Sequence, residues 1–253
     1  MLYTSTHNEK IKTLKKLKEK KYRDQENLFL IEGEHLIKEA ANSNVLKEII
    51  CLERMNIDVD VPVHYASKEV MNILTNVESP SNMIGVCIKQ EEKDFSGNIL
   101  ILDDVQDPGN LGAIIRSAVA FNVNTIVLSE HTVDLYNPKV IRASQGMLFK
   151  VNIIRKDLIS FIEEIKKKDY HILATQLIHG KNIKKLEKKQ KLAIIMGNEG
   201  KGVSKPLLDL SDEFIYINMN ETCESLNVAV ASSIILYELW GEWLWTMFIL
   251  VKL

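Results

Sequence analysis

Polar side chains that could act in catalysis lie in three segments, each directly after an apolar run. The first segment, LDDVQDPGNLGAIIRSAVAF, carries Asn110 and Arg116 on a predicted helix that begins near Leu111. An Asn at this place is either a helix cap or a site residue. The Arg, one to two turns into the helix, is either a solvated side chain or faces the strand ends, where a guanidinium can hold a phosphate through two hydrogen bonds.

The second segment, MGNEGKGVS, is a glycine-rich turn after a buried strand. Its glycines, Gly197, Gly200 and Gly202, permit backbone conformations closed to other residues and let a ligand approach the main chain closely. Their spacing fits neither the GxxxxGK(S/T) phosphate loop nor the GxGxxG dinucleotide fingerprint. The segment is therefore a plain turn or a ligand loop of another kind, and Glu199 inside it could simply favour the N-terminus of the next helix.

The third segment, INMNETCESLNVAVASSIILYE, is a polar loop followed by a long helix. We expect the helix to start around Ser225 or Leu226, with Ser225 or Glu224 as its cap. Its small apolar residues suit packing against a sheet or a second subunit. By itself, the pattern fits an ordinary core helix.

Short apolar runs alternate with helices after residue 98, which is typical of a parallel sheet covered on both faces. The predicted strands are ILILD (99–103), TIVL (125–128), HILAT (171–175), LAIIM (192–196) and FIYIN (214–218). Ligands of such α/β sheets bind beyond the carboxyl ends of the strands. We therefore expect the three polar segments at one edge of the sheet.

The chain before this sheet forms a smaller α/β unit. We expect a basic helix over 10–21, a strand over 28–33, a helix over 34–41, and strands in VLKEII, VPVHYA and MIGVCI with the helix SKEVMNILTN between the last two. The polar stretch KQEEKDFSGN is a linker. We therefore predict one domain over 1–92 and a second over 97–253.

The composition excludes several protein classes. The 253 residues are 46% hydrophobic and 26% charged, as in a globular protein, and the net charge of −2 argues against indiscriminate coating of nucleic acid. Three scattered cysteines, Cys51, Cys87 and Cys223, and histidines without ligand spacing predict neither a disulfide framework nor a metal site. We expect a cytoplasmic protein without a secretory signal, because the N-terminus has no apolar core of the signal type.

Two regions differ in composition from the rest of the chain. The apolar stretch 240–253 is shorter than the ~20 residues that a membrane span needs, so we expect it to pack on the protein or at an interface. Between Lys10 and Arg23 there are eight basic residues against one acid, Glu19. Such a run is a solvated helix face or a local binding site for a polyanion.

Taken together, DPGNLGAIIR, GNEGKGVS and ESLNVAVA closely resemble the three sequence motifs of the SpoU (TrmH) family of RNA ribose 2′-O-methyltransferases, in the SPOUT class. YNPKVIRASQGMLFKV resembles the family's segment between the first two motifs. Residues 5–40 resemble the start of its small substrate-binding domain, which is similar to ribosomal protein L30e. The resemblance covers nearly the whole chain up to about Glu238 and implies an α/β fold: a SPOUT-type parallel sheet with a C-terminal trefoil knot, preceded by the L30e-like domain.

The resemblance also implies an activity, the transfer of a methyl group from S-adenosylmethionine to a ribose 2′-hydroxyl in structured RNA, above all 23S-type ribosomal RNA. The family's catalytic positions correspond to Asn110, Arg116, Glu199, Ser225 and Asn227. Its cofactor-binding positions correspond to Thr175, Gly197, Ile217, Met219 and Leu226. We expect Arg116 to orient the phosphate beside the target ribose, because a guanidinium pKa above about 12 makes this side chain a poor base.

The partners implied by the resemblance are RNA and a second copy of the chain. Family members pair as homodimers through the knot, and the small-residue helix after Asn227 fits such an interface. RNA contacts are expected from a basic set: Lys10, Lys15, Lys16, Lys20, Lys21, Arg23 and Arg142. No metal ion and no membrane partner are expected.

Some alternatives stay open. The third motif begins INMNETCESLN where the family often has Pro and Gly, which bears on cofactor affinity. The substrate could be tRNA, although the L30e-like opening favours large-subunit rRNA. The chain could instead be an RNA-binding ribosome-assembly protein of this fold without turnover, or a nucleotide-dependent α/β enzyme, which the missing phosphate motifs oppose.

Overall fold

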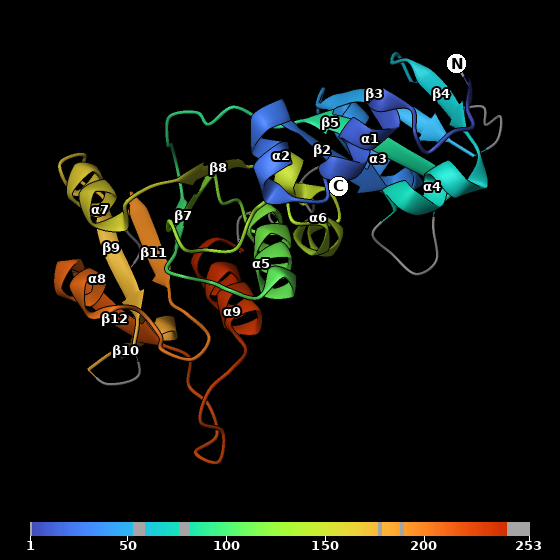
Figure 1. Ribbon diagram of the computed structural model, residues 1–253. Helices are drawn as coiled ribbons and strands as arrows, with labels where there is room; N and C mark the ends of the chain where they lie inside the picture. Colours follow the sequence, from blue (N-terminus) through green and yellow to red (C-terminus); the bar gives the residue numbers. More distant parts are fainter. Residues whose placement is uncertain (1, 53–58, 76–80, 177–178, 188–189, 242–253) are drawn as a thin grey trace, which may run out of the picture. The chain divides into compact units, whose positions relative to one another are not determined.

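The computed structural model describes residues 2–52, 59–75, 81–176, 179–187 and 190–241. The chain divides into two compact units (Figure 1). The first unit comprises Met1–Glu91 with Asp134–Lys150, and the second comprises Glu92–Val133 with Val151–Leu253. The predicted division into domains 1–92 and 97–253 stays a prediction. The segment Asp134–Lys150, which lies between two motifs of the second unit, groups with the first.

The second unit is built on a parallel sheet. Seven strands lie in the order β10-β12-β9-β11-β6-β7-β8, and every neighbouring pair is parallel. The strands are β6 Ile99–Leu102, β7 Thr125–Leu128, β8 Asn152–Arg155, β9 His171–Thr175, β10 Lys181–Asn182, β11 Leu192–Met196 and β12 Glu213–Tyr216. The five predicted strands are confirmed, whereas β8 and β10 were not predicted. All residues of β6 and β7 are buried, as expected for strands covered on both faces.

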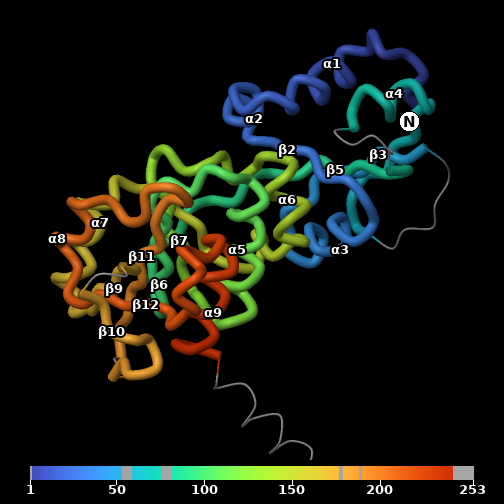
Figure 2. Tube along the Cα trace, turned by 90° about the horizontal axis from the view of Figure 1, so that it is seen from below, coloured from blue at the N-terminus to red at the C-terminus, as the bar shows by residue number. Residues whose placement is uncertain are grey.

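Helices cover both faces of this sheet (Figure 2). They are α5 Pro108–Ala120, α7 Leu158–Lys166, α8 Lys205–Leu210 and α9 Val228–Trp240. On one face, α7 and α8 bury Phe161 and Leu207 against strand residues such as Ile101. On the other face, α5 and α9 pack together, and the hydroxyls of Ser117 and Ser233 lie 2.7 Å apart. The predicted α/β architecture is confirmed, and the trefoil knot stays a prediction.

The first unit contains a mixed sheet of five strands in the order β1-β4-β3-β5-β2. Strand β5 is antiparallel to β2 and β3, and the other pairs are parallel. The strands are β1 Leu2–Tyr3, β2 Leu28–Glu32, β3 Leu46–Cys51, β4 Val63–Ala66 and β5 Met83–Ile88. The helices are α1 Glu9–Lys16, α2 Lys20–Glu26, α3 Glu34–Asn42, α4 Lys68–Leu74 and α6 Pro138–Ser144. Ile11 and Leu14 of α1 are buried in the core of this unit.

The basic run forms two helices, α1 and α2, where a single helix was predicted. The buried guanidinium of Arg23 donates hydrogen bonds to the main-chain carbonyls of Leu17 and Lys18, at 2.8 and 2.7 Å. These bonds satisfy carbonyl groups at the end of α1. Arg23 also pairs with Asp134 at 2.5 Å, so a buried ion pair stabilises the break between the helices.

The cysteines are free thiols, of which Cys51 and Cys87 are buried and Cys223 is exposed. Burial raises the pKa of the Cys87 thiol. Among the residues described, no group of three or more His, Cys, Asp or Glu could hold a metal ion. In the same part of the chain, no helix is long and apolar enough to cross a membrane. Of the apolar tail 240–253, Trp240 is the buried last residue of α9, and 242–253 lie outside the described residues.

Candidate functional site

The three polar segments meet at the carboxyl edge of the parallel sheet, as expected. The register aligns the last residues of four neighbouring strands, so that Met196, Leu102, Leu128 and Arg155 follow one another across the sheet. The loops after β6, β11 and β12 leave this edge, and each belongs to one of the segments. The fold therefore brings together residues that are more than 100 positions apart in the chain.

A cavity of about 520 Å³ opens between the loops after β11 and β12 and the start of α9. The five residues predicted to bind a cofactor all line it: Thr175, Gly197, Ile217, Met219 and Leu226. Glu199 and Ser225, from the predicted catalytic set, line it as well. A mostly apolar lining with a few polar groups is typical of sites for small organic ligands.

Asn198 shapes the glycine-rich loop. Its Oδ1 accepts hydrogen bonds from the main-chain N–H groups of Gly200 and Lys201, at 2.9 and 3.1 Å. Asn198 and Gly202 also exchange main-chain hydrogen bonds of 3.0 and 2.9 Å. A Cβ at Gly197 would lie 2.0 Å from the main-chain carbon of Gly202, so the loop closes tightly only with glycine at that position.

Helix α5 begins at Pro108, earlier than predicted. Asp107 is its cap, and the Asp107 carboxylate accepts the main-chain N–H of Asn110 at 2.8 Å. The interpretation of Asn110 as the helix cap is therefore wrong. Asn110 lies in the first turn of α5, and its side chain is free to contact other segments.

Helix α9 begins at Val228, later than the predicted start at 225 or 226. Its cap is Asn227, whose Oδ1 accepts the main-chain N–H of Ala229 at 2.9 Å. The prediction that Ser225 or Glu224 caps this helix is therefore wrong. Ser225 instead lies exposed in the loop before the helix.

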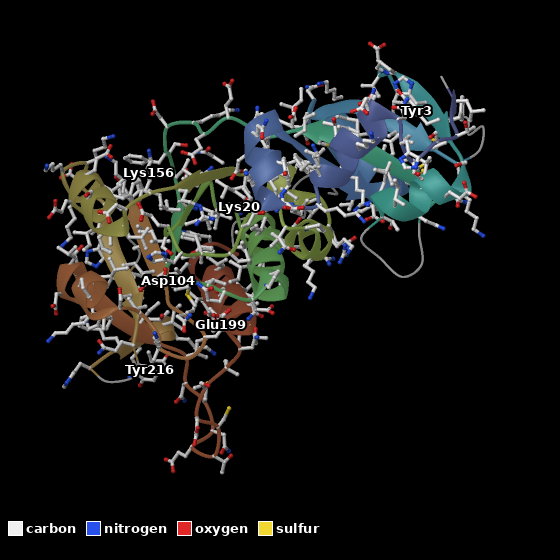
Figure 3. The ribbon with its side chains drawn as sticks, viewed as in Figure 1. Tyr3, Lys20, Asp104, Lys156, Glu199 and Tyr216 are labelled. Atoms are coloured by element: carbon white, nitrogen blue, oxygen red, sulfur yellow. The ribbon has the colours of Figure 1, made fainter. Side chains whose placement is uncertain are left out.

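Glu199, which is labelled in Figure 3, joins the three segments through a network of hydrogen bonds. The side-chain amide of Asn227 donates to Oδ1 of Asn110 at 2.9 Å, and the amide of Asn110 donates to Oε1 of Glu199 at 3.1 Å. The carboxylate of Glu199 also accepts the main-chain N–H groups of Gln106 and Asp107, at 3.3 and 3.2 Å. Three of the predicted catalytic residues thus form one connected network.

These contacts determine the charge of Glu199. Burial raises the pKa of this carboxyl, but hydrogen bonds from the Asn110 side chain and from main-chain N–H groups outweigh burial, so the pKa lies below its ordinary value of 4.5. The group is ionised at neutral pH, and donors surround its oxygens. A carboxylate in this arrangement aligns its neighbours and is a poor acceptor for a further proton.

Arg116 is not brought to this cavity within one chain. It lies exposed on α5 and is absent from the residues that line the cavity. The structure therefore unites Asn110, Glu199 and Asn227 by hydrogen bonds and places Ser225 in the cavity wall. It leaves Arg116 on the surface of the helix that carries Asn110.

The predicted RNA-binding residues differ in exposure. Exposed on α1 and α2 are Lys15, Lys16, Lys20 and Lys21. Lys10 is partly exposed and pairs with Glu48, and Arg142 is partly buried on α6. Arg23 is only 4% exposed, and its guanidinium faces main-chain carbonyls and Asp134. The prediction that Arg23 contacts RNA is therefore wrong, because the side chain is buried inside the first unit.

Three residues that shape the site were not predicted from the sequence: Asp107, Asn198 and Gln106. An Asp directly before Pro-Gly is a signal for a helix cap and indicates the true start of α5. An Asn in a glycine-rich loop is a signal for a turn closed by its own side chain. Gln106 gives no such signal, because its bond to Glu199 uses the main-chain N–H.

Two family models match the chain. The SpoU rRNA Methylase family matches residues 97–237, which include the cavity and the Glu199 network. The MRM3-like substrate binding domain matches residues 8–85, which include α1 to α4.

Similar proteins share most of the chain. The 23S rRNA (guanosine(2553)-2′-O)-methyltransferase RlmP of Bacillus subtilis (strain 168) is 38% identical over 94% of this chain and 98% of its own length. The uncharacterized tRNA/rRNA methyltransferase slr1673 of Synechocystis is 29% identical over 93% and 92%. The rRNA methyltransferase from Sinorhizobium meliloti superposes with a TM-score of 0.84 at 26% identity, covering 94% and 96% of the two chains. A crystal structure of an AdoMet-bound rRNA methyltransferase from Sinorhizobium meliloti superposes with a TM-score of 0.83 at 26% identity, covering 94% and 96% of the two chains.

Proposed function

The chain belongs to the SpoU rRNA methylase family, and we propose that it transfers a methyl group from S-adenosylmethionine to a ribose 2′-hydroxyl of 23S-type ribosomal RNA. The observation that carries this proposal is the cavity at the carboxyl edge of the sheet, with Glu199 in its wall and Asn110 hydrogen-bonded to Glu199. The similarity to RlmP, a 23S rRNA 2′-O-methyltransferase, supports the choice of substrate.

The cavity suits S-adenosylmethionine, whose sulfonium supplies the electrophilic methyl group. Ile217 and Leu226 offer apolar surface to the adenine, and the glycine at 197 exposes main-chain groups that can bond to its edge. The hydroxyl of Thr175 donates to the Ile195 carbonyl at 3.3 Å, which leaves its oxygen available as an acceptor. Met219 completes this side of the cavity.

The chain's own residues position the RNA and shape the site. A ribose hydroxyl is a poor nucleophile, so much of the acceleration comes from its alignment with the methyl group. We assign Arg116 to the phosphate beside the target ribose, because a guanidinium grips phosphate through two hydrogen bonds and keeps its proton. We assign Ser225 in the cavity wall, and Asn110 and Asn227 outside that wall, to the positioning of the ribose. Glu199 is the ionised group that holds Asn110, and Asn110 in turn accepts the amide of Asn227.

We further propose a homodimer that pairs through α5 and α9, with the trefoil knot at the interface. On α9, Val230 and Tyr237 are 48% and 51% exposed, although both are large apolar or aromatic side chains. Tyr237 meets the ring of Phe121, the partly buried C-cap of α5, edge-on at 5.7 Å, so the exposed side chain on α9 also contacts the end of α5. In such a dimer the exposed Arg116 of one protomer serves the cavity of its partner, which accounts for its place outside the cavity of its own chain.

We propose that the first unit binds the RNA through its exposed lysines, and that the enzyme works in the cytoplasm, where ribosomal RNA is modified. Lys15 and Lys16 are exposed on α1, and Lys16 and Lys21 lie 5.4 and 5.8 Å from the ring centre of Tyr22. Cations beside an aromatic ring form a surface suited to phosphates and unpaired bases. Lys10 and Arg142, which are less exposed, are further candidates.

The test uses methyl-labelled S-adenosylmethionine with 23S rRNA transcribed in vitro. We expect label at one nucleotide, whose 3′ phosphodiester then resists alkaline hydrolysis because the 2′ oxygen is blocked. Transcripts of 16S rRNA and tRNA are the controls. Label in tRNA alone would show that tRNA, and not 23S rRNA, is the substrate. Cofactor binding without methyl transfer would indicate an assembly protein. Absence of cofactor binding would overturn the proposal.

A further inference from the structure

Arg155 is the last residue of β8 and lies on the same edge of the sheet as the site. In the register of the sheet, Arg155 pairs with Leu128 of β7, and Leu128 pairs with Leu102 of β6. Leu102 in turn pairs with Met196 of β11, at the start of the glycine-rich loop. Three strand spacings separate Arg155 from Met196, a distance of about 14 Å. Arg155 therefore acts on the site only through what lies between them.

The guanidinium of Arg155 binds the loop that follows β7. It donates hydrogen bonds to four main-chain carbonyls of this loop, those of Ser129, Glu130, Thr132 and Val133, and the last three measure 2.9, 2.9 and 3.1 Å. Each such bond from a charged donor is stronger than one between neutral groups. The planar guanidinium thus fixes the path of residues 129–133 at several points.

This loop contacts the site by two routes. By the first route, the His131 carbonyl accepts the side-chain amide of Gln106 at 2.7 Å, and the main-chain N–H of Gln106 donates to Glu199. By the second route, the Ser129 hydroxyl donates to the carboxylate of Asp104 at 2.6 Å and accepts its N–H at 3.0 Å.

The second route continues to the glycine-rich loop. The main-chain carbonyl of Asp104 accepts the side-chain amide of Asn198 at 2.8 Å, and Asn198 is the residue that closes that loop. Asp104 has a φ of 57°, a conformation that a non-glycine residue adopts at some cost. Ser129 and Asn198 hold it there from two sides. Both routes from Arg155 therefore end at neighbouring residues, Asn198 and Glu199.

We propose that Arg155 is a positioning residue for methyl transfer, because it fixes residues 129–133. This loop holds Gln106 and Asp104. These two residues in turn hold Glu199 and Asn198 in place. This proposal rests on the proposed function for its kinetic readout. Its structural part is independent of that function, because the bond between Gln106 and Glu199 exists in the protein without RNA. The two are therefore tested by separate measurements.

The first measurement is hydrogen exchange of the Gln106 main-chain N–H, followed by NMR in the full chain without RNA. Arg155→Met should speed this exchange about tenfold, while amides in β6 keep their wild-type rates. Gln106→Ala, which keeps the main-chain N–H but removes the bond to His131, should have the same effect. Lys156→Met, at the adjacent exposed cation, is the control and should change nothing.

The second measurement is the single-turnover rate of methyl transfer to 23S rRNA. We expect Arg155→Met and Gln106→Ala each to lower it about tenfold with little change in cofactor affinity, and the double variant to be no slower than either. Arg155→Lys should be intermediate, because one ammonium cannot reach all the carbonyls. If Arg155→Met is too unstable to study, the Lys variant and Gln106→Ala carry the same test.

The proposal is overturned if the Gln106 N–H exchanges at the wild-type rate in the Arg155 variants, even if their melting temperature falls. Arg155 would then stabilise only residues 129–133. Additive rate losses in the double variant would overturn it as well. A wild-type protein that transfers no methyl group would refute the proposed function alone, and the exchange measurement would still decide the role of Arg155.

Discussion

The side-chain amide of Asn227 donates a hydrogen bond of 2.9 Å to the side-chain oxygen of Asn110, across 117 positions of sequence. Each Asn also makes a second contact, because Asn227 caps α9 through its oxygen and Asn110 donates its own amide to Glu199. Every polar atom of the Asn110 amide is therefore committed to another segment. The bond fixes the start of α9 relative to the start of α5 and to the glycine-rich loop.

Replacing Asn110 with Ala removes both of these contacts. We expect the free energy of unfolding to fall by about 1 to 2 kcal/mol, since partners on two segments lose a hydrogen bond. Methyl transfer should fall about 100-fold, because the catalytic groups lose their alignment. The cofactor dissociation constant, measured by calorimetry, should change little because Asn110 does not line the cavity. Gln25→Ala, on the exposed surface of α2, is the control. If Asn110→Ala weakened cofactor binding as much as it slowed methyl transfer, Asn110 would not act by aligning the catalytic groups.

Substitution by Ala should have opposite effects on stability at two glycines of the same loop, Gly197 and Gly200. A Cβ at Gly197 would meet main-chain atoms of Gly202 and Val203 at 2.0 to 2.3 Å, whereas a Cβ at Gly200 meets only the side chain of Asn198, at 3.7 Å. Gly197→Ala should therefore cost about 2 to 4 kcal/mol of stability and weaken cofactor binding at least tenfold. Gly200→Ala should leave both nearly unchanged. Thermal melts with and without S-adenosylmethionine compare them, and equal behaviour of the two variants would show that the loop adapts.

The strands of the parallel sheet were predictable because each is a run of apolar residues buried on both faces. Strand β8 was missed because polar residues, Asn152 and Arg155, flank its two isoleucines, of which only Ile154 is buried. Strand β10 was missed because it has only two residues. The starts of α5 and α9 were misplaced by a few residues. In both cases the true cap, Asp107 or Asn227, was present in the sequence but competed with other plausible caps nearby.

The contacts that build the site were less predictable than the elements. The bond between Asn110 and Asn227 depends on strand order, which no local pattern encodes. The burial of Arg23 depends on Asp134, 111 positions away, so the local charge run gave no sign of it. Seven of the residues that the resemblance implied line the cavity, and Asn110, Arg116 and Asn227 do not. The resemblance carried no information about which hydrogen bonds connect the segments.

Arg116 is predicted to act on RNA and not on the cofactor. Arg116→Ala should abolish methyl transfer, with a loss of about 1000-fold, while cofactor affinity and melting temperature stay near wild type, because the side chain is exposed and outside the cavity. Lys at this position should restore only part of the rate, since an ammonium cannot grip phosphate in the two-bond manner. Lys205→Ala, at an exposed cation of α8, is the control. Parallel loss of cofactor binding in Arg116→Ala would instead indicate a collapsed site.

Exposed and buried cations of the basic run should behave differently. Changing Lys15 and Lys16 to Glu should weaken RNA binding and reduce the slope of log affinity against log salt by about 1 to 2, because each lysine that contacts a phosphate releases counterions. The free energy of unfolding should fall by no more than about 1 kcal/mol, because both lysines are exposed. Arg23→Ala should instead lower the free energy of unfolding by about 3 kcal/mol, because it leaves Asp134 without its buried partner.

Filter binding across salt concentrations and urea unfolding separate these two effects. An Arg23→Ala protein of wild-type stability that binds RNA weakly would reverse the assignment and return Arg23 to the RNA surface. Unchanged RNA affinity in the double Lys variant would mean that the RNA lies on another face of the first unit.

The pH dependence of stability tests the role of Glu199. Its pKa in the folded protein lies below the ordinary value of 4.5, because hydrogen bonds to the ionised form outweigh burial. Near that pH the unfolded chain therefore binds more protons, and this group contributes stability that is present above about pH 4.5 and is lost as the pH falls through the folded value. A Gln at this position keeps the shape but carries no charge, and its amide faces the Gln106 and Asp107 N–H groups with one acceptor instead of two.

Glu199→Gln should therefore cost about 1 kcal/mol at pH 7, a modest value because the side chain is partly solvated. The difference from wild type should be constant from pH 7 to about pH 5.5 and should shrink as the pH falls further below 4.5, since wild-type Glu199 then becomes neutral too. Urea unfolding followed by circular dichroism at a series of pH values measures it, and other titrating groups cancel in the comparison. A difference that stays the same down to pH 3 would mean that the ionised form of Glu199 does not hold the three segments together.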